Sequence, residues 1–392
     1  MSQAERNVPG VIDAMAKLVS LNSISSVLPE YDQSNLAVIE QLAEWFDALG
    51  FETVILPVPG TVGKANLVAT LGTGDGGLVL SGHTDTVPCN PERWQSDPFT
   101  LTERDGRLYG LGSCDMKGFF ALVLHAVKSW KASDLAQPLI VLATADEESS
   151  MTGARALARQ TQLNARYAVV GEPTSLRPVR MHKGIMMEGV RLVGRAGHSS
   201  DPSLGVNALD AMHDVIGELK SVRYELAQRY QNAHFAVQTP TMNLGCIHGG
   251  DNPNRICGSC ELAFDLRALP GMSNDDLRDE MQRRLTPVAE RSGVTLEWQT
   301  HFPGVSPFET PASSPLVEVA ERLTGNDSQA VAFATEAPFL QQMGMDTLVL
   351  GPGSIDQAHQ VDEYLALDQI EPCLNILQGL ITRFCARHTD GV

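Results

Sequence analysis

The segment that most constrains the fold of this chain is 78–85, Leu-Val-Leu-Ser-Gly-His-Thr-Asp. Its apolar start predicts a short buried strand that breaks at Gly82. His83 and Asp85 therefore stand at a strand end, where open α/β sheets gather their ligands, and on extended chain they point the same way. An imidazole and a carboxylate on one side suit a metal site, in which one group binds the ion and the other orients it. For so short a motif taken alone, a histidine satisfied by its neighbouring aspartate is the commoner explanation.

Further candidate ligands follow apolar runs or open a helix. Asp115 precedes the helical run 119–127, so its plain alternative is a helix N-cap. The doublet Glu147-Glu148 follows a strand-like run and could be a solvated acidic turn. Glu172 could merely close a strand, and His359 is the last candidate. Because all of them stand where ligands gather in α/β sheets, one shared site explains them better than separate coincidences.

Five motifs together resemble the dinuclear zinc amidohydrolases of the M20 peptidase family, over nearly the whole chain. They are His83-x-Asp85, Gly112-x-x-Asp115-Met-Lys-Gly118, Asp146-Glu-Glu148, Gly171-Glu172-Pro and Ala358-His359. Further runs are similar to members that remove an acetyl group from an N-acetylated amino acid, namely 82–88, 97–103, 197–202, 335–338 and 350–355. The resemblance implies an enzyme that acts on a small N-acetyl amino acid.

The resemblance also implies a ligand set for two divalent metal ions. Asp115 would bridge the ions, His83 and Glu172 would complete one site, and Glu148 and His359 the other. Imidazole and carboxylate suit zinc, and a bridging anion offsets the repulsion between two dications about 3.5–4 Å apart. Zn²⁺ is the predicted metal, although the same donors accept cobalt or manganese.

Glu147 remains outside this ligand set, and the resemblance makes it the general base. With its neighbour Glu148 bound to metal, Glu147 can take a proton from water at the metals and return it to the departing amine. Asp85 would hydrogen-bond His83 from behind. The resemblance further implies a cis peptide between Asp115 and Met116.

Four residues are expected to meet the substrate. The resemblance makes His198 the donor to the oxyanion, although it could equally be an ordinary loop histidine. Asn254 and Arg267 match positions that hold a substrate carboxylate in the resembled family, and a guanidinium fork suits that task. Glu336 could meet a cationic side chain, and its alternative is a surface turn.

Alternating helical and strand-like runs predict an α/β fold with two domains. A catalytic domain, 1–181 and 293–392, has a mixed, largely parallel sheet and must be discontinuous, because His359 returns to it late in the chain. The insertion 182–292 reads as a ferredoxin-like α+β lid, of the split βαβ type. In the family that this chain resembles, the lid domains of two subunits pair with each other. A C2 homodimer is therefore expected, with His198 of each subunit serving the active site of its partner.

Charge and cysteines narrow the partners and the compartment. Lys plus Arg number 29 and Asp plus Glu 47, and the net charge of −18 argues against nucleic acid or an anionic membrane. The first residues show no secretory signal, so a cytoplasmic protein is expected. Seven cysteines fit a reducing compartment better than a disulfide framework. Cys260 of the pair Cys257-x-x-Cys260 is predicted to lie in the core, and Cys114 to pack beside the metal site.

Two other functions share these features. A related dipeptidase or succinyl-amino-acid desuccinylase would use the same metal chemistry and differ at the substrate pocket. A metal-binding interaction protein could keep the fold and lose catalysis, but a purely structural site would have no need of a free base such as Glu147.

Overall fold

The structure, a computed structural model, describes residues 8–387 and divides the chain into two compact units. Unit 1 comprises Met1–Arg180, Thr310–Gln329 and Thr335–Val392, and unit 2 comprises Met181–Glu309 and Ala330–Ala334. The predicted insertion, 182–292, ends before strand β12 (Thr295–Val305), which pairs with β9 (Ile185–Val193). That pairing places β12 in unit 2.

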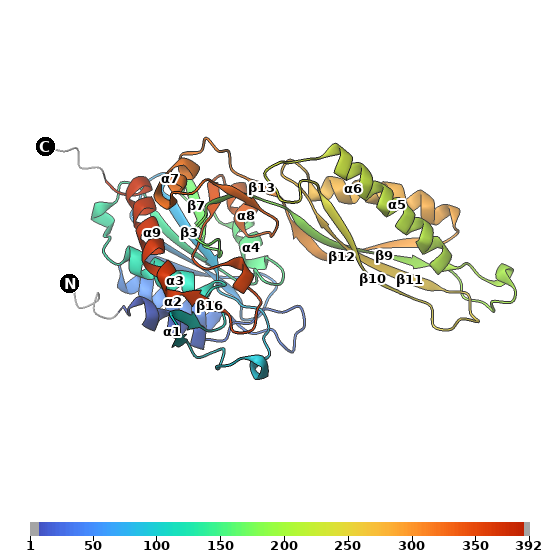
Figure 1. Cartoon of the computed structure of the whole chain (residues 1–392), viewed down its shortest axis with the longest axis horizontal. Coiled ribbons are helices and arrows are strands. Elements are labelled where there is room, and N and C mark those ends of the chain that lie inside the picture. The colour runs from blue at the N-terminus through green and yellow to red at the C-terminus, as the bar shows by residue number, and fades with distance from the viewer. Residues whose placement is uncertain (1–7, 388–392) are drawn as a thin grey trace. The chain divides into compact units, whose positions relative to one another are not determined.

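Unit 1 is built on a mixed sheet with the strand order β1-β2-β6-β3-β7-β15-β8 (Figure 1). The four strands β6, β3, β7 and β15 are parallel neighbours, while β1, β2 and β8 run antiparallel to theirs. This sheet confirms the predicted α/β class. Its strands are β1 (Glu52–Pro57), β2 (Ala65–Leu71), β3 (Leu78–His83), β6 (Leu139–Thr144), β7 (Tyr167–Val170), β8 (Val179–His182) and β15 (Asp346–Val349). The short strands β13 (Phe308–Glu309) and β14 (Gln329–Val331) pair with β8.

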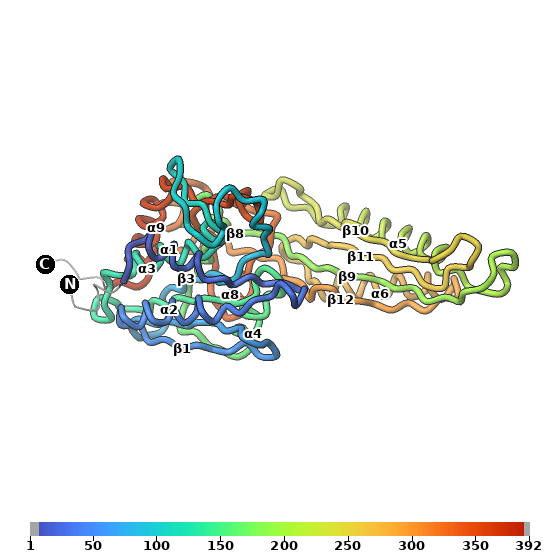
Figure 2. The backbone as a smooth tube through the Cα atoms, turned by 90° about the horizontal axis from the view of Figure 1, so that it is seen from below, coloured from blue at the N-terminus to red at the C-terminus, as the bar shows by residue number. Residues whose placement is uncertain are grey.

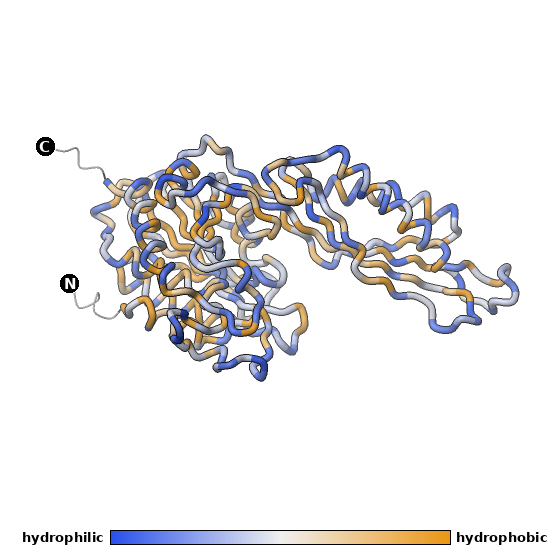
Figure 3. Tube along the Cα trace, viewed as in Figure 1, coloured by the Kyte–Doolittle hydropathy of each residue, from blue (hydrophilic) through white to orange (hydrophobic). Residues whose placement is uncertain are grey.

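Helices cover both faces of this sheet, so the central strands read as continuous apolar runs. Every residue of β3 and β6 is buried. Leu78 and Leu80 point into the main core with five helices, α1 (Val11–Ser20), α2 (Leu36–Ala48), α3 (Lys117–Val127), α7 (Pro315–Thr324) and α9 (Ile370–Phe384). Two helices that pack against each other, α4 (Thr152–Gln160) and α8 (Ala337–Gln342), complete the layers. Figure 3 shows hydrophobic residues gathered along these strands.

Unit 1 also contains a small second sheet, which begins in the segment 102–109. The chain forms two short strands, β4 (Thr102–Arg104) and β5 (Arg107–Tyr109), because Asp105 and Gly106 both adopt left-handed φ values of 52° and 73°. A late strand, β16 (Tyr364–Ala366), pairs with β5. The segment that follows His359 is thereby joined to the segment that precedes Asp115.

Unit 2 has the predicted element order βαββαβ. Its antiparallel sheet has the order β10-β11-β9-β12, with β10 (Thr241–Gly249) and β11 (Ser259–Arg267), and the helices α5 (Ala208–Arg229) and α6 (Asn274–Arg291) lie on one face (Figure 2). Alternate residues of β11 are buried against these helices, among them Cys260, as predicted. Helix α5 begins at Ala208, because Pro202–Leu204 forms a separate turn and the Asn207 side chain caps the helix.

Among residues 8–387, none of the helices combines the length and the apolar character that crossing a membrane requires.

Candidate metal centre

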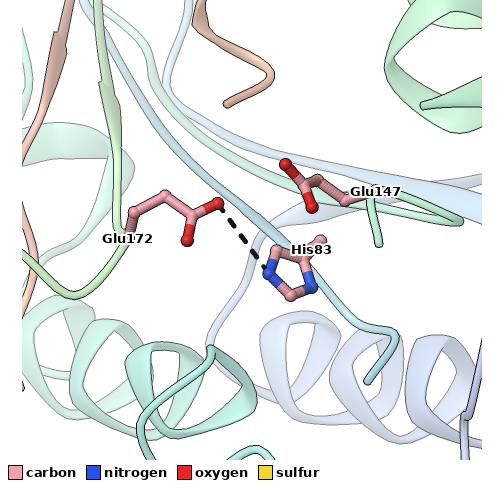
Figure 4. A group of neighbouring side chains, drawn as sticks. All are labelled: His83, Glu147 and Glu172. Atoms are coloured by element: carbon pink, nitrogen blue, oxygen red, sulfur yellow. Dashed lines mark ion pairs between the residues drawn. The ribbon is translucent and has the colours of Figure 1, made fainter. Parts of the chain in front are cut away.

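The predicted ligands gather where strands of unit 1 end. His83 is the last residue of β3, Glu172 follows the end of β7, and the doublet Glu147-Glu148 follows the end of β6. Figure 4 shows the side chains of His83, Glu147 and Glu172 converging from these three segments. Because β3, β6 and β7 are parallel, their carboxyl ends lie at one edge of the sheet, the usual ligand position in such folds.

The Asp115 carboxylate lies between two imidazoles. Its Oδ1 is 3.1 Å from Nε2 of His83, and its Oδ2 is 3.8 Å from Nε2 of His359. One carboxylate oxygen therefore faces each histidine. This is the arrangement that a carboxylate bridging two metal ions requires.

A further carboxylate accompanies each imidazole. Glu172 Oε1 lies 3.8 Å from His83 Nε2 (dashed in Figure 4), and Glu148 Oε2 lies 2.9 Å from His359 Nε2. Ligand atoms of His83, Asp115 and Glu148 all lie within 4.8 Å of one another. Those of His83, Glu147 and Glu172 do so as well. The structure thus brings together all five predicted ligands and the predicted base.

The donor set fits divalent metal. Within residues 8–387, Glu172 Oε1 is a buried oxygen without a hydrogen-bond partner, and such an atom is costly unless a cation meets it. Imidazole nitrogens and carboxylate oxygens are the donors that zinc accepts. Unit 1 can therefore hold divalent metal through His83, Asp115, Glu148, Glu172 and His359.

Burial, hydrogen bonds and neighbouring charges shift the pKa values of the site residues. Burial raises the pKa of Glu172 well above its ordinary value, and the nearby charge of Asp115 adds to this. Burial lowers the pKa of His83, but its hydrogen bond to Asp115 and the surrounding carboxylates outweigh this and raise it well above its ordinary value. The hydrogen bond to Glu148 raises the pKa of His359 to about 8. Bound cations would reverse this preference of the carboxyls for the protonated form.

Asp85 has a wider task than the predicted support of His83. The Nδ1 of His83 lies 3.0 Å from the backbone carbonyl oxygen of Asp85 and 3.7 Å from its carboxylate. The carboxylate itself accepts hydrogen bonds from the backbone N–H of Glu147, at 3.2 Å, and of Glu148, at 3.0 Å. Asp85 therefore orients His83 through its main chain and holds the acidic doublet through its side chain.

The turn before the doublet depends on a buried ion pair that sequence reasoning missed. Asp146 has a left-handed φ of 58°, which is uncommon outside glycine. Its Oδ1 lies 2.7 Å from the Nζ of Lys64, which also reaches Asp32, at 2.8 Å, and it accepts a hydrogen bond from Ser25, at 2.9 Å. No local motif marks Lys64 as a partner, because it precedes Asp146 by more than eighty residues.

Glu336 lies inside unit 1, which excludes the alternative of a surface turn. Its side chain is 1% exposed and accepts hydrogen bonds from Ser81 Oγ, at 2.5 Å, and from Thr144 Oγ1, at 2.6 Å. Ser81 lies in β3 two residues before His83, and Thr144 is the last residue of β6, three residues before Glu147. Both oxygens of the carboxylate are therefore engaged by the protein, and its predicted contact with a cationic substrate group stays a prediction.

The remaining predicted site residues belong to unit 2. His198 Nδ1 accepts a hydrogen bond from the backbone N–H of Ser200, at 3.2 Å, and lies 2.8 Å from its hydroxyl. The backbone N–H of Ser199, the residue after His198, donates to the carbonyl of Asn254. Unit 2 thus places His198 and Asn254 on neighbouring exposed segments. Arg267 ends β11 and pairs with Asp265, at 3.2 Å.

The peptide between Asp115 and Met116 is cis, as the resemblance implies, and Cys114 is buried beside Asp115.

One carboxylate between two histidines at the ligand edge of an α/β sheet is the arrangement of a divalent-metal centre. The chain belongs to peptidase family M20/M25/M40, whose family model matches residues 79–383. That match spans every ligand of the proposed centre and the whole of unit 2.

Relatives agree with this assignment. The chain is 47% identical over 380 residues to an acetylornithine deacetylase of Pasteurella multocida (strain Pm70), which covers 97% of this chain and 99% of that protein. Its fold is similar to that of an M20 family metallo-carboxypeptidase from Sulfolobus solfataricus, with a TM-score of 0.73 and 17% identity over 97% of this chain and 99% of that one. A dinuclear metal-binding M20 peptidase from Bacillus subtilis matches with a TM-score of 0.67 and 13% identity, over 94% and 96% of the two chains.

Proposed function

We propose that this protein removes the acetyl group from N2-acetyl-L-ornithine, giving L-ornithine and acetate, a step of arginine biosynthesis in the cytoplasm. The observation that carries the proposal is the Asp115 carboxylate, which faces His83 with one oxygen and His359 with the other. The identity of 47% to an acetylornithine deacetylase, over nearly the whole of both chains, supports the choice of substrate.

Two Zn²⁺ ions, or Co²⁺ in their place, would polarise the acetyl carbonyl and lower the pKa of water toward about 7. Asp115 would be the bridging ligand, with His83 and Glu172 on one side and Glu148 and His359 on the other.

Glu147 performs the proton transfers. Its backbone N–H donates to Asp85, and its carboxylate lies within 4.8 Å of ligand atoms of His83 and Glu172. Burial raises the pKa of Glu147 well above its ordinary value, and the charge of Glu172 contributes to this. A raised pKa suits a group that takes a proton from water and returns it to the leaving α-amine.

Unit 2 would complete the reaction. His198 donates to the oxyanion of the acetyl group from the partner subunit of a homodimer that pairs through unit 2. Asn254 and Arg267 hold the α-carboxylate of the substrate, and Glu336 supplies negative charge toward the cationic end of ornithine. The neighbouring exposed segments of His198 and Asn254 support a shared role.

The decisive experiment is acetate release from N2-acetyl-L-ornithine by the purified protein. We expect turnover that a chelator abolishes and that added Zn²⁺ or Co²⁺ restores, because the nucleophile depends on metal. N-succinyl amino acids and dipeptides, tested in parallel, should be much poorer substrates. Preference for either of them would mean that the protein is the related desuccinylase or dipeptidase, with the same metal chemistry. Metal binding without any hydrolysis would mean that the protein has lost catalysis.

A further inference from the structure

The carboxylate of Glu363 is buried against the loop that carries Asp115. Only 2% of the Glu363 residue is exposed. Its Oε1 accepts hydrogen bonds from the backbone N–H of Cys114, at 2.8 Å, and of Asp115, at 2.9 Å, and its Oε2 accepts one from Gly112, at 3.1 Å. Three main-chain donors of one short loop therefore converge on one side chain.

Convergent backbone N–H groups form a concavity that selects an anion. All three contacts to Glu363 are made by donors, so an acceptor-only carboxylate satisfies every one of them. The loop is shaped for this arrangement, because Gly112 has a left-handed φ of 81° and a Cβ there would come within 2.7 Å of the Lys117 side chain. Lys117 is itself fully buried; burial lowers its pKa to about 7, and the nearby charge of Glu363 opposes this shift.

Glu363 also connects two metal-ligand segments. It follows His359 by four residues, and its backbone carbonyl accepts a hydrogen bond from Gly110, at 3.1 Å. Strand β16, which begins at the next residue, pairs with β5 ahead of the loop. The main chain and the side chain of Glu363 thus connect the segment after His359 to the segment before Asp115. The Nε2 of His359 and the Oδ2 of Asp115 lie 3.8 Å apart.

We propose that Glu363 is a positioning residue that fixes the main chain of Asp115 so that its carboxylate meets both metal ions. The inference rests on the dinuclear centre of the proposed function. Glu363 takes part in no bond that is made or broken. It holds the 112–115 loop in the metal-binding conformation in the metal-free protein. This preorganisation raises the affinity for metal, because the loop need not be ordered on binding.

Glu363→Gln tests the proposal with little change of shape. The amide keeps one acceptor oxygen but presents an NH₂ group to a backbone donor. We expect the affinity for Zn²⁺ to fall by about 10–100-fold, the usual effect of removing a partner that orients a metal ligand. A competition titration of the metal-free protein against a chelator measures this affinity without reference to activity. Glu363→Asp, whose carboxylate is too short to reach all three donors, should not restore it.

The matched control is Glu188→Gln in unit 2. Glu188 is also fully buried and accepts hydrogen bonds from Arg278, Trp298 and Thr300, but it contacts none of the five ligands among the described residues. This variant should lower the thermal midpoint and leave Zn²⁺ affinity unchanged. Equal losses of Zn²⁺ affinity in both variants would mean that Glu363 acts only by stabilising the fold. An unchanged Zn²⁺ affinity in Glu363→Gln would refute the proposal.

A measurement on the wild-type protein covers the case in which Glu363→Gln does not fold. Hydrogen exchange of the Gly112, Cys114 and Asp115 amides should be slow in the metal-free protein, because Glu363 holds them already. Fast exchange that slows only when Zn²⁺ is added would show that metal, and not Glu363, orders the loop. If the wild-type protein binds no Zn²⁺, the proposed function fails first, and the exchange result still decides whether Glu363 holds the loop.

Discussion

Glu147→Ala is expected to lower kcat by roughly 10²–10⁴-fold while both metal ions stay bound, because general acid and base catalysis contributes about that much. The side chain of Glu147 lies beside His83 and Glu172 (Figure 4), near enough to reach a water at the centre. The five ligands form the two facing groups around Asp115 without it. Metal analysis of the purified variant, together with its kcat, measures both halves of the prediction.

Glu148→Ala is the matched comparison, since the two residues are neighbours and Asp85 holds both backbone N–H groups. Glu148 contacts His359 at 2.9 Å, so its removal should reduce metal content as well as activity. The geometry alone allows a competing assignment, because Glu147 also lies within ligand distance of His83 and Glu172. A Glu147→Ala protein that loses metal, beside a Glu148→Ala protein that keeps it, would reverse the roles of the doublet.

The ligand edge of unit 1 could be predicted from the sequence because four of the five ligands follow a buried strand or precede a buried helix, whereas His359 lies in a loop after the turn Ile355–Gln357. The strands before His83 and Glu147 are buried throughout, and each begins with an apolar run, Leu78–Leu80 and Leu139–Ala143, as expected of strands covered on both faces. Such runs fix where a parallel strand ends, and therefore which polar residues emerge at the ligand edge. The bridging role of Asp115 came from resemblance, and the structure adds the placement of its two oxygens.

The supporting contacts could not be predicted, because their partners are distant in sequence and carry no local pattern. Glu363 stands in a polar stretch after His359, and only the pairing of β16 with β5 brings it under the Asp115 loop. The pairing of Lys64 with Asp146 likewise depends on how β2 lies beside β6. Glu336 illustrates the same limit, since an acidic residue before Ala-Pro suggests a turn, whereas strand hydroxyls engage it in the interior.

His198→Ala and Glu147→Ala, each nearly inactive alone, are expected to recover activity when the two proteins are unfolded and refolded together. Removal of an oxyanion donor lowers kcat by about 10²–10³-fold, so the parent proteins give a low background. In a mixed dimer, one site combines the intact Glu147 of one chain with the partner's intact His198. Random pairing in a C2 dimer at equal amounts gives about one quarter of all sites this composition, and kcat per subunit should recover to about that fraction.

The recovery depends on His198 acting across the dimer, and two controls make the result specific. Each variant refolded alone should stay inactive, which excludes activation by refolding. Glu147→Ala mixed with Glu148→Ala should also stay inactive, because both substitutions are in unit 1 and every site of their mixed dimer keeps a damaged centre. Distinguishable tags on the two chains establish that mixed dimers form. If they form and the His198→Ala and Glu147→Ala mixture remains inactive, His198 serves its own chain or takes no part in catalysis.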